Sequence, residues 1–239
     1  MTIRPSLPFV RPRTYFREYG PGLPLVPALV TVLLVALAIT ASFAGAGWLM
    51  MTNIAEDATV EKPDRPPEQF CEGTEPGDPF YDDCHPERVP MDDALWTAIT
   101  DELPLVFATV LLLWVGLAAV LYLLPAWLGD PDGPPHDAFA VAAWAMVPFV
   151  GQSIAGVAAV AWFLRDRTLS GDAATLESQI GMLVGILEGP VFLAVTGFIV
   201  GWQGYIVYQG LNEGRGMAAS TAGGVAAFFS LVLFSLQLA

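Results

Sequence analysis

The stretch GPVFLAVTGFIVGWQGYIVYQGLNEGRGM, from Gly189 to Met217, decides the fold of this chain. It begins at a helix-breaking Gly-Pro pair, continues without a charge as far as Asn212, and ends in a tight polar turn. A helix over residues 190–211 would rise about 30 Å, which matches the hydrocarbon thickness of a bilayer. A second apolar run starts directly after the turn, so we interpret the stretch as the fourth of five membrane-crossing helices.

Charged residues are scarce in this chain, and they occur in groups. Only 14% of the 239 residues are charged, whereas soluble domains of this size are nearer a quarter charged. The uncharged runs predict five crossings, at about 25–50, 103–128, 138–164, 190–211 and 217–238. The predicted fold class is therefore an all-α integral membrane protein, with residues 25–239 forming a five-helix membrane domain.

The segment between the first two predicted crossings, about 52–100, is a long acidic loop. It carries most of the net charge of −14, and Lys62 is the only lysine of the chain. An acid-rich, lysine-poor surface resembles that of proteins from salt-in halophilic archaea, because molar salt screens charge repulsion beyond about 3 Å. The alternative is an ordinary acidic loop. Low apolarity predicts a mostly irregular segment, and no basic patch indicates nucleic-acid binding.

Both cysteines of the chain, Cys71 and Cys84, lie in this loop. A disulfide between them would close a short loop and would indicate an oxidising, external face of the membrane. Free thiols are a second interpretation. A third is a metal site that adds His85 and Asp82 or Asp83, which no standard zinc spacing supports. We expect the disulfide, and the sequence indicates no cofactor.

The N-terminal segment, residues 1–24, determines the predicted orientation. Its four arginines stand among aromatic residues, a composition typical of a basic strip lying at a cytoplasmic membrane surface, although a disordered tail is the alternative. Arginines ahead of the first crossing place the N-terminus in the cytoplasm. Five crossings then place the acidic loop and the C-terminus outside the cell membrane. Arg165 and Arg167 would also lie outside, against the same rule.

Two of the predicted crossings carry polar and aromatic residues at helical spacing. The residues are three or four positions apart: Trp144, Pro148 and Gln152 in the third crossing, and Trp202, Tyr205 and Gln209 in the fourth. Residues at such spacings share one face of a helix. Pro148 also frees a backbone carbonyl that a neighbouring helix or water must satisfy. We therefore expect the two faces to pack together, the alternative being an aromatic belt that faces lipid.

Two motifs in these crossings resemble the Yip family, the Ypt/Rab-interacting membrane proteins and their prokaryotic relatives. One is the run from Ala143-Trp144 to Pro148, in which small residues lead into a proline. The more specific one is Trp202-x-x-Tyr205 followed by Gly210-Leu211-x-x-Gly214-Arg215-Gly-Met217 and the small residues Ser220 and Ala222. It resembles the family's aromatic–Gly-Leu turn before a helix of small residues. The long acidic loop departs from the compact pattern of the family.

The resemblance implies a non-catalytic membrane organiser or interaction scaffold, in contact with the lipid bilayer and with membrane-protein partners or further copies of itself. The small-GTPase partner of the eukaryotic relatives is not carried over, because the N-terminal segment is short. Both histidines lie in loops, and the absence of HExxH and Gly-x-Ser-x-Gly motifs argues against an enzyme.

The alternative function is a component of a small-molecule or ion permease that uses Glu188. This is the one ionisable residue inside an apolar run, and ionisable residues at membrane depth often mark ion pathways. A second interpretation is that Glu188 lies at the outer water boundary as a helix-start residue. Gly189-Pro190 follows it, and a carboxylate at that point meets the positive end of the helix dipole.

Overall fold

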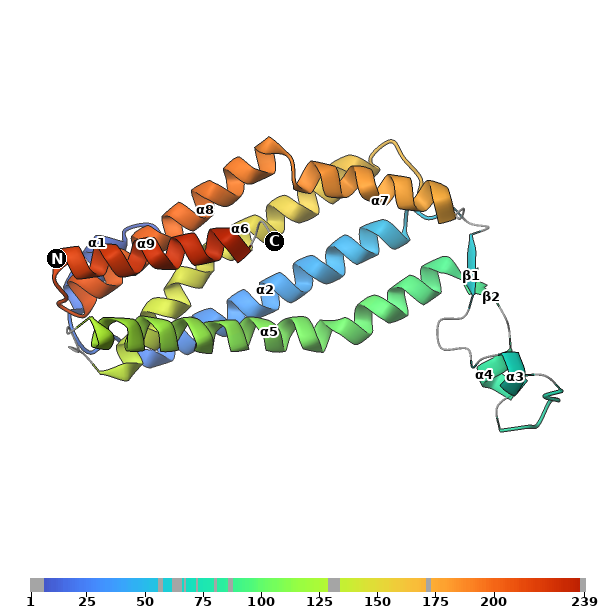
Figure 1. Cartoon of the computed structure of the whole chain (residues 1–239), viewed down its shortest axis with the longest axis horizontal. Coiled ribbons are helices and arrows are strands. Elements are labelled where there is room, and N and C mark those ends of the chain that lie inside the picture. The colour runs from blue at the N-terminus through green and yellow to red at the C-terminus, as the bar shows by residue number, and fades with distance from the viewer. Residues whose placement is uncertain are drawn as a thin grey trace, which may run out of the picture. The chain divides into compact units, whose positions relative to one another are not determined.

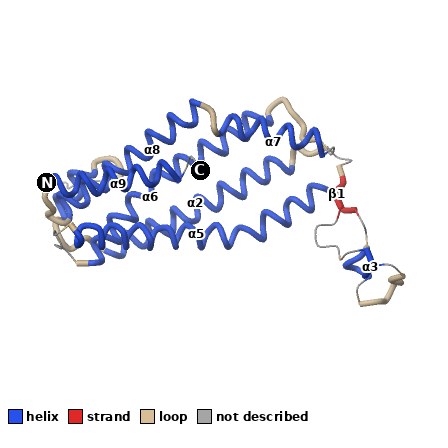
Figure 2. The backbone as a smooth tube through the Cα atoms, viewed as in Figure 1, coloured by secondary structure: helices blue, strands red, loops and turns tan. Residues whose placement is uncertain are grey.

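The computed structural model describes residues 7–55, 58–61, 66, 68–71, 73–79, 81–85, 88–128, 134–170 and 173–236. Helices dominate the described chain, and its strands, β1 (Thr59–Glu61) and β2 (Arg88–Pro90), form one short antiparallel pair (Figure 2). The helices, in chain order, are α1 (Pro12–Tyr19), α2 (Leu25–Met51), α3 (Glu68–Cys71), α4 (Tyr81–Cys84), α5 (Met91–Trp127), α6 (Pro135–Leu164), α7 (Ala173–Leu187), α8 (Pro190–Gln209), the π-helical η1 (Gly210–Gly214) and α9 (Ala219–Leu236) (Figure 1).

Four helical segments are long and apolar enough to cross a membrane: α2, α5, α6 and the continuous α8–η1 segment. Their outer surfaces carry large apolar side chains, such as Val26, Leu112 and Phe198, that are 71–73% exposed. Such surfaces are compatible with lipid rather than water. The predicted all-α membrane protein is thereby confirmed. The fifth predicted crossing is α9, whose 18 residues are close to the minimum that spans a bilayer, so the count of five stays a prediction.

Helix α5 begins at Met91, well ahead of the predicted crossing at 103–128. The predicted acidic loop, about 52–100, therefore contains β1, β2, α3 and α4 together with the first turns of α5. Asp92 and Asp93 lie in the first turn of α5, where acidic side chains stabilise the positive end of the helix dipole. The charge pattern located the apolar part of α5 and not its start, because a helix can continue beyond the membrane.

The chain divides into two compact units, one of residues 1–42, 105–155 and 189–239, the other of residues 43–104 and 156–188. In the first unit, α8 and α9 pack closely as an antiparallel pair. A Cβ atom at Gly204 would collide with the hydroxyl of Ser230, and one at Gly197 would lie 4.0 Å from the ring of Phe234. Glycine thus permits the close approach of the two helices, as small residues commonly do in membranes.

In the second unit, the buried apolar cluster joins the last turns of α6 (Val160, Phe163 and Leu164) to Leu169 and to Leu183 of α7. Backbone bonds hold the segment after α6 against the end of α2. The N–H of Leu169 donates to the carbonyl of Asn53 at 2.7 Å, and the N–H of Ala55 donates to the carbonyl of Leu169 at 3.0 Å.

Candidate functional site: the α1–η1 junction

Helix α1 is amphipathic, and its apolar side is buried in the protein. Tyr15 and Phe16 are 6% and 0% exposed, whereas Arg13 and Arg17 face outward. Phe16 packs on Gly214 of η1, where an added Cβ atom would lie 3.3 Å from the Phe16 ring. Burial raises the pKa of Tyr15 to about 12, so its phenol is neutral. The aromatic side of the predicted N-terminal strip therefore packs on η1, and the basic side stays exposed.

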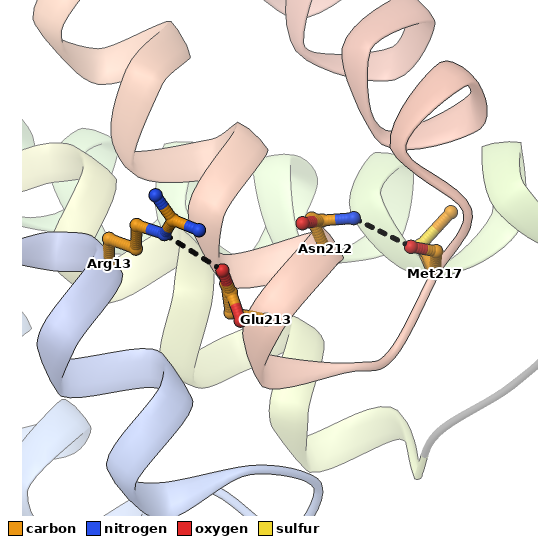
Figure 3. Close-up of polar contacts among 4 residues, drawn as sticks. All are labelled: Arg13, Asn212, Glu213 and Met217. Atoms are coloured by element: carbon orange, nitrogen blue, oxygen red, sulfur yellow. Dashed lines mark hydrogen bonds and ion pairs between the residues drawn. The ribbon is translucent and has the colours of Figure 1, made fainter.

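An ion pair joins the outer side of α1 to η1. Nε of Arg13 donates to Oε1 of Glu213 at 3.0 Å, with the two side chains 63% and 20% exposed (Figure 3). Next to it, Nδ2 of Asn212 donates to the carbonyl of Met217 at 2.9 Å and closes the turn before α9 (Figure 3). Exposed ion pairs contribute about 0–1 kcal/mol, so apolar burial contributes more than the ion pair to holding α1 in place.

Asp137, at the start of α6, binds the connection between α1 and α2. Its carboxylate is 0% exposed and accepts hydrogen bonds from the N–H of Leu23 at 2.7 Å and of Gly22 at 3.1 Å. Nε2 of His136 lies 3.4 Å from the same carboxylate and would pair with it when protonated. Charge-assisted bonds of this kind compensate the burial of a carboxylate. The sequence analysis missed Asp137, although an acidic residue in the first turn after a Pro-Pro pair is a recognisable helix-start signal.

Arg215 binds the end of α5 to the segment after η1. It is 2% exposed, and its Nη1 donates to the carbonyl of Leu121 at 2.9 Å. That carbonyl would normally bond to the N–H four residues later, but this position is Pro125, which has no N–H. The guanidinium also lies 5.8 Å from the centre of the Tyr122 ring. Arg215 of the Gly-Leu turn motif therefore binds the backbone carbonyl of Leu121, which Pro125 leaves without its usual donor.

Helix α6 meets the α8–η1 segment at two described contacts. At one end Gly210 lies against Val141, and at the other Nε2 of Gln152 lies 3.5 Å from Oγ1 of Thr196. These contacts use Thr196 of α8 and Gly210 of η1. Leu211, next to Gly210, is fully buried.

The sequence predicted that Trp202, Tyr205 and Gln209 would pack on the face of α6 that carries Trp144. The structure places these residues elsewhere. Tyr205 is 39% exposed, although Gln209 is 5% exposed. The indole N–H of Trp202 donates to the carbonyl of Phe9 at 3.0 Å, and the ring of Trp144 packs on Tyr15 at 5.7 Å. Pro148 is half-buried inside α6. The N-terminal segment contacts both tryptophans, and spacing along one helix carries no information about that segment.

Gln203 is a fully buried polar residue of α8 that lies outside the predicted contact face. Its side chain is 0% exposed, and within the described chain neither amide atom has a hydrogen-bond partner. A glutamine inside an apolar run was the available signal, since such side chains hydrogen-bond across helices in membranes.

Glu188 lies at the break between α7 and α8, and its side chain is exposed. Its N–H donates to the carbonyl of Val184 at 2.8 Å, Gly189 is the N-cap of α8, and Pro190 occupies the first turn. The geometry is that of a residue preceding a helix start.

An open groove of about 710 Å³ between α6 and α8 is lined by apolar residues, among them Gly151, Val191 and Phe198.

Cys71 and Cys84 are joined in the acidic segment, with their Cα atoms 5.5 Å apart. Cys84 is 0% exposed. The bond occupies both thiolates that the alternative metal site would need, and no group of three metal-binding side chains occurs among the described residues. His85 packs on the ring of Tyr81 at 4.7 Å.

The chain matches the family model described as the Yip1 domain over residues 8–239. The match includes both compact units, the α1–η1 junction and the Gly-Leu turn. Searches of curated proteins and of solved structures each find no significant match.

Proposed function

The chain belongs to the Yip1 domain family, and we propose that this multi-pass membrane protein is a non-catalytic organiser or interaction scaffold of the cell membrane. In this proposal the bundle resides in the bilayer and α1 faces the cytoplasm. The acidic segment and the C-terminus face outward. The partners are other membrane proteins or further copies of the chain.

The observation that supports this proposal is that the buried charged residues bond to backbone groups of the protein itself. Asp137 and Arg215 are the buried charged residues of the described chain. Each bonds to backbone groups, Asp137 to the connection between α1 and α2 and Arg215 to α5. Residues 138–164, 190–212 and 216–239 contain no Asp, Glu, Lys or Arg. Proton and ion pathways in membranes are usually marked by chains of such groups. The buried charges of this bundle bind backbone groups of neighbouring segments and so stabilise the fold, which favours a scaffold over a pump.

The proposed contact surface is the outer side of α1. Packing of Phe16 on η1 fixes this helix, so that the exposed Thr14 and Arg17 are presented on a rigid element. Rigid presentation reduces the ordering cost of binding.

The test is site-specific photo-crosslinking in native membranes, with a crosslinking amino acid at Thr14 and, as the control, at Leu34, which is 60% exposed on the apolar surface of α2. We expect a discrete protein adduct from position 14 and only lipid adducts from position 34. The measurement that contradicts the proposal is solute or ion flux into proteoliposomes that Glu188→Gln abolishes, because that result would make the chain a permease component.

The orientation is tested in a background without cysteines. Single cysteines at the exposed positions Thr14 and Glu75 should differ in labelling by an impermeant thiol reagent added to intact cells. Position 75 should be labelled and position 14 should not. Labelling at 14 alone would invert the proposed topology.

A further inference from the structure

Two arginines follow directly after the end of α6. Arg165 and Arg167 are exposed, and neither guanidinium forms an ion pair within the described residues. The chain has 24 acidic residues against 10 basic ones, so unpaired arginines are unexpected in it. Asp166 lies between the two, and the local charge is still positive.

The two side chains line a hollow of about 210 Å³ together with Trp162, Phe163 and Asp166. The guanidinium of Arg167 lies over the ring of Phe163, 4.5 Å from its centre. Stacking of this kind orients the planar group and leaves the N–H donors along its edge available. Trp162 is 65% exposed beside them. The hollow thus combines two cationic forks with aromatic surface.

The backbone that carries the arginines is held firmly. Nε2 of Gln179 donates to the carbonyl of Thr168 at 3.1 Å, and the N–H of Ser170 donates to Oε1 of Gln179 at 3.0 Å. Leu169, between these residues, exchanges backbone bonds with Asn53 and Ala55. A site on a backbone fixed at both sides loses little entropy when it binds a ligand.

The hollow is at the level of lipid headgroups if α6 crosses the membrane. Helix α6 has 30 residues and therefore a length of about 45 Å, which equals the thickness of a bilayer with its headgroups. An exposed tryptophan at the end of a crossing is typical of that level. Arginines after a helix also offset the negative end of its dipole, but this role requires neither the hollow nor the stacking of Arg167 on Phe163.

We propose that this hollow binds the phosphate of an anionic phospholipid headgroup. Arg165 and Arg167 donate hydrogen bonds to the phosphate oxygens, and Trp162 contacts the glycerol and the upper acyl chain. The assignment deepens the organiser role by naming its lipid class, and it rests on α6 crossing the membrane and not on the α1 surface.

The experiment is a titration of the purified full-length protein in detergent with phosphatidylglycerol, in which native mass spectrometry counts the bound lipids. We expect one tightly bound lipid, whose affinity falls about fivefold for each of Arg165→Gln and Arg167→Gln. The double variant R165Q/R167Q should lose it. Arg88→Gln is the matched control, because Arg88 belongs to the same compact unit and bonds to Thr59. It should bind as the wild type does.

Further arms identify the ligand. The charge-preserving variant R165K/R167K should retain most of the binding, and it replaces the glutamine variant if that one fails to fold. Inorganic phosphate at millimolar concentration should not displace the lipid, and phosphatidylcholine should bind weakly. Unchanged lipid binding in R165Q/R167Q, an equal loss in R88Q, or displacement by inorganic phosphate would each overturn the assignment. Crosslinking at Thr14 tests the scaffold proposal separately and should not change in R165Q/R167Q.

Discussion

Pro125 and Pro148 each remove a backbone donor from a membrane helix, but the side chains around the two freed carbonyls differ. Pro125 frees the carbonyl of Leu121 near the end of α5, where the cation of Arg215 binds it at 2.9 Å. Pro148 frees the carbonyl of Trp144 in the middle of α6. The contacts of Gly210 in η1 with Val141 and of Thr196 in α8 with Gln152 bracket this position.

The side chain of α8 midway between those two contacts is Gln203, a neutral amide. The cation of Arg215 is buried near the end of α5, whereas a charge at the bilayer centre is costly. Gln203 is buried as well, but neither of its amide atoms has a hydrogen-bond partner within the described chain. The comparison indicates that a side-chain donor replaces the missing backbone N–H at Pro125, and that Gln203 does not do so at Pro148.

The largest effect is expected at the junction itself, from Asp137→Ala. This variant leaves the buried N–H groups of Gly22 and Leu23 without their acceptor and should destabilise the protein by about 3 kcal/mol, since hydrogen bonds to charged groups contribute about 1.5–3 kcal/mol each. Unfolding in mixed detergent micelles, followed by circular dichroism, measures the change. Asp93→Ala, at the exposed start of α5, is the control. Equal losses in both variants would argue against a special role for Asp137.

The second effect concerns Arg215 and Pro125. Arg215→Met should cost about 2 kcal/mol by removing the donor to Leu121. In the background Pro125→Ala the loss of stability should be smaller. Alanine, unlike proline, has a backbone N–H that can donate to the carbonyl of Leu121 in place of Arg215. The double-mutant cycle, measured by the same unfolding assay, isolates this coupling. Strict additivity would mean that the two residues act independently.

A smaller effect is expected at Gln203. Because neither amide atom of Gln203 has a hydrogen-bond partner within the described chain, Gln203→Leu should leave the free energy of unfolding unchanged or raise it slightly, since a buried amide without a partner is unfavourable. The same substitution in the background Pro148→Ala should have the same effect in the same unfolding assay. A loss of about 0.6 kcal/mol, the average for hydrogen bonds between membrane helices, seen with Pro148 and absent with Pro148→Ala, would show that the amide does bind the carbonyl freed by Pro148.

The smallest effect is expected at the exposed pair of Arg13 and Glu213. Each of Arg13→Gln and Glu213→Gln should change stability by less than about 1 kcal/mol, and less at high salt, because the ions are screened. Phe16→Ala should cost about 3 kcal/mol by comparison, with detachment of α1 detected by limited proteolysis near Gly20. A loss in R13Q as large as that in F16A would mean that charge rather than burial holds the helix.

The amino-acid sequence by itself determined the class of protein, the approximate positions of its apolar helices and the two motifs that resemble the Yip family. These features depend on hydrophobicity and charge, which are read along one segment at a time. For the same reason the α8 stretch around Trp202 and the pairing candidates Cys71 and Cys84 could be singled out in advance.

The tertiary structure alone decided which faces meet. Trp144 and Trp202 contact the N-terminal segment, Gly210 and not Tyr205 lies against α6, and Asp137 binds a segment more than a hundred residues earlier in the chain. Each of these contacts depends on the close packing of helices brought together from distant parts of the sequence. Periodicity indicates that a face is buried, but the identity of the neighbour follows from the shapes and unsatisfied backbone groups of all the helices together.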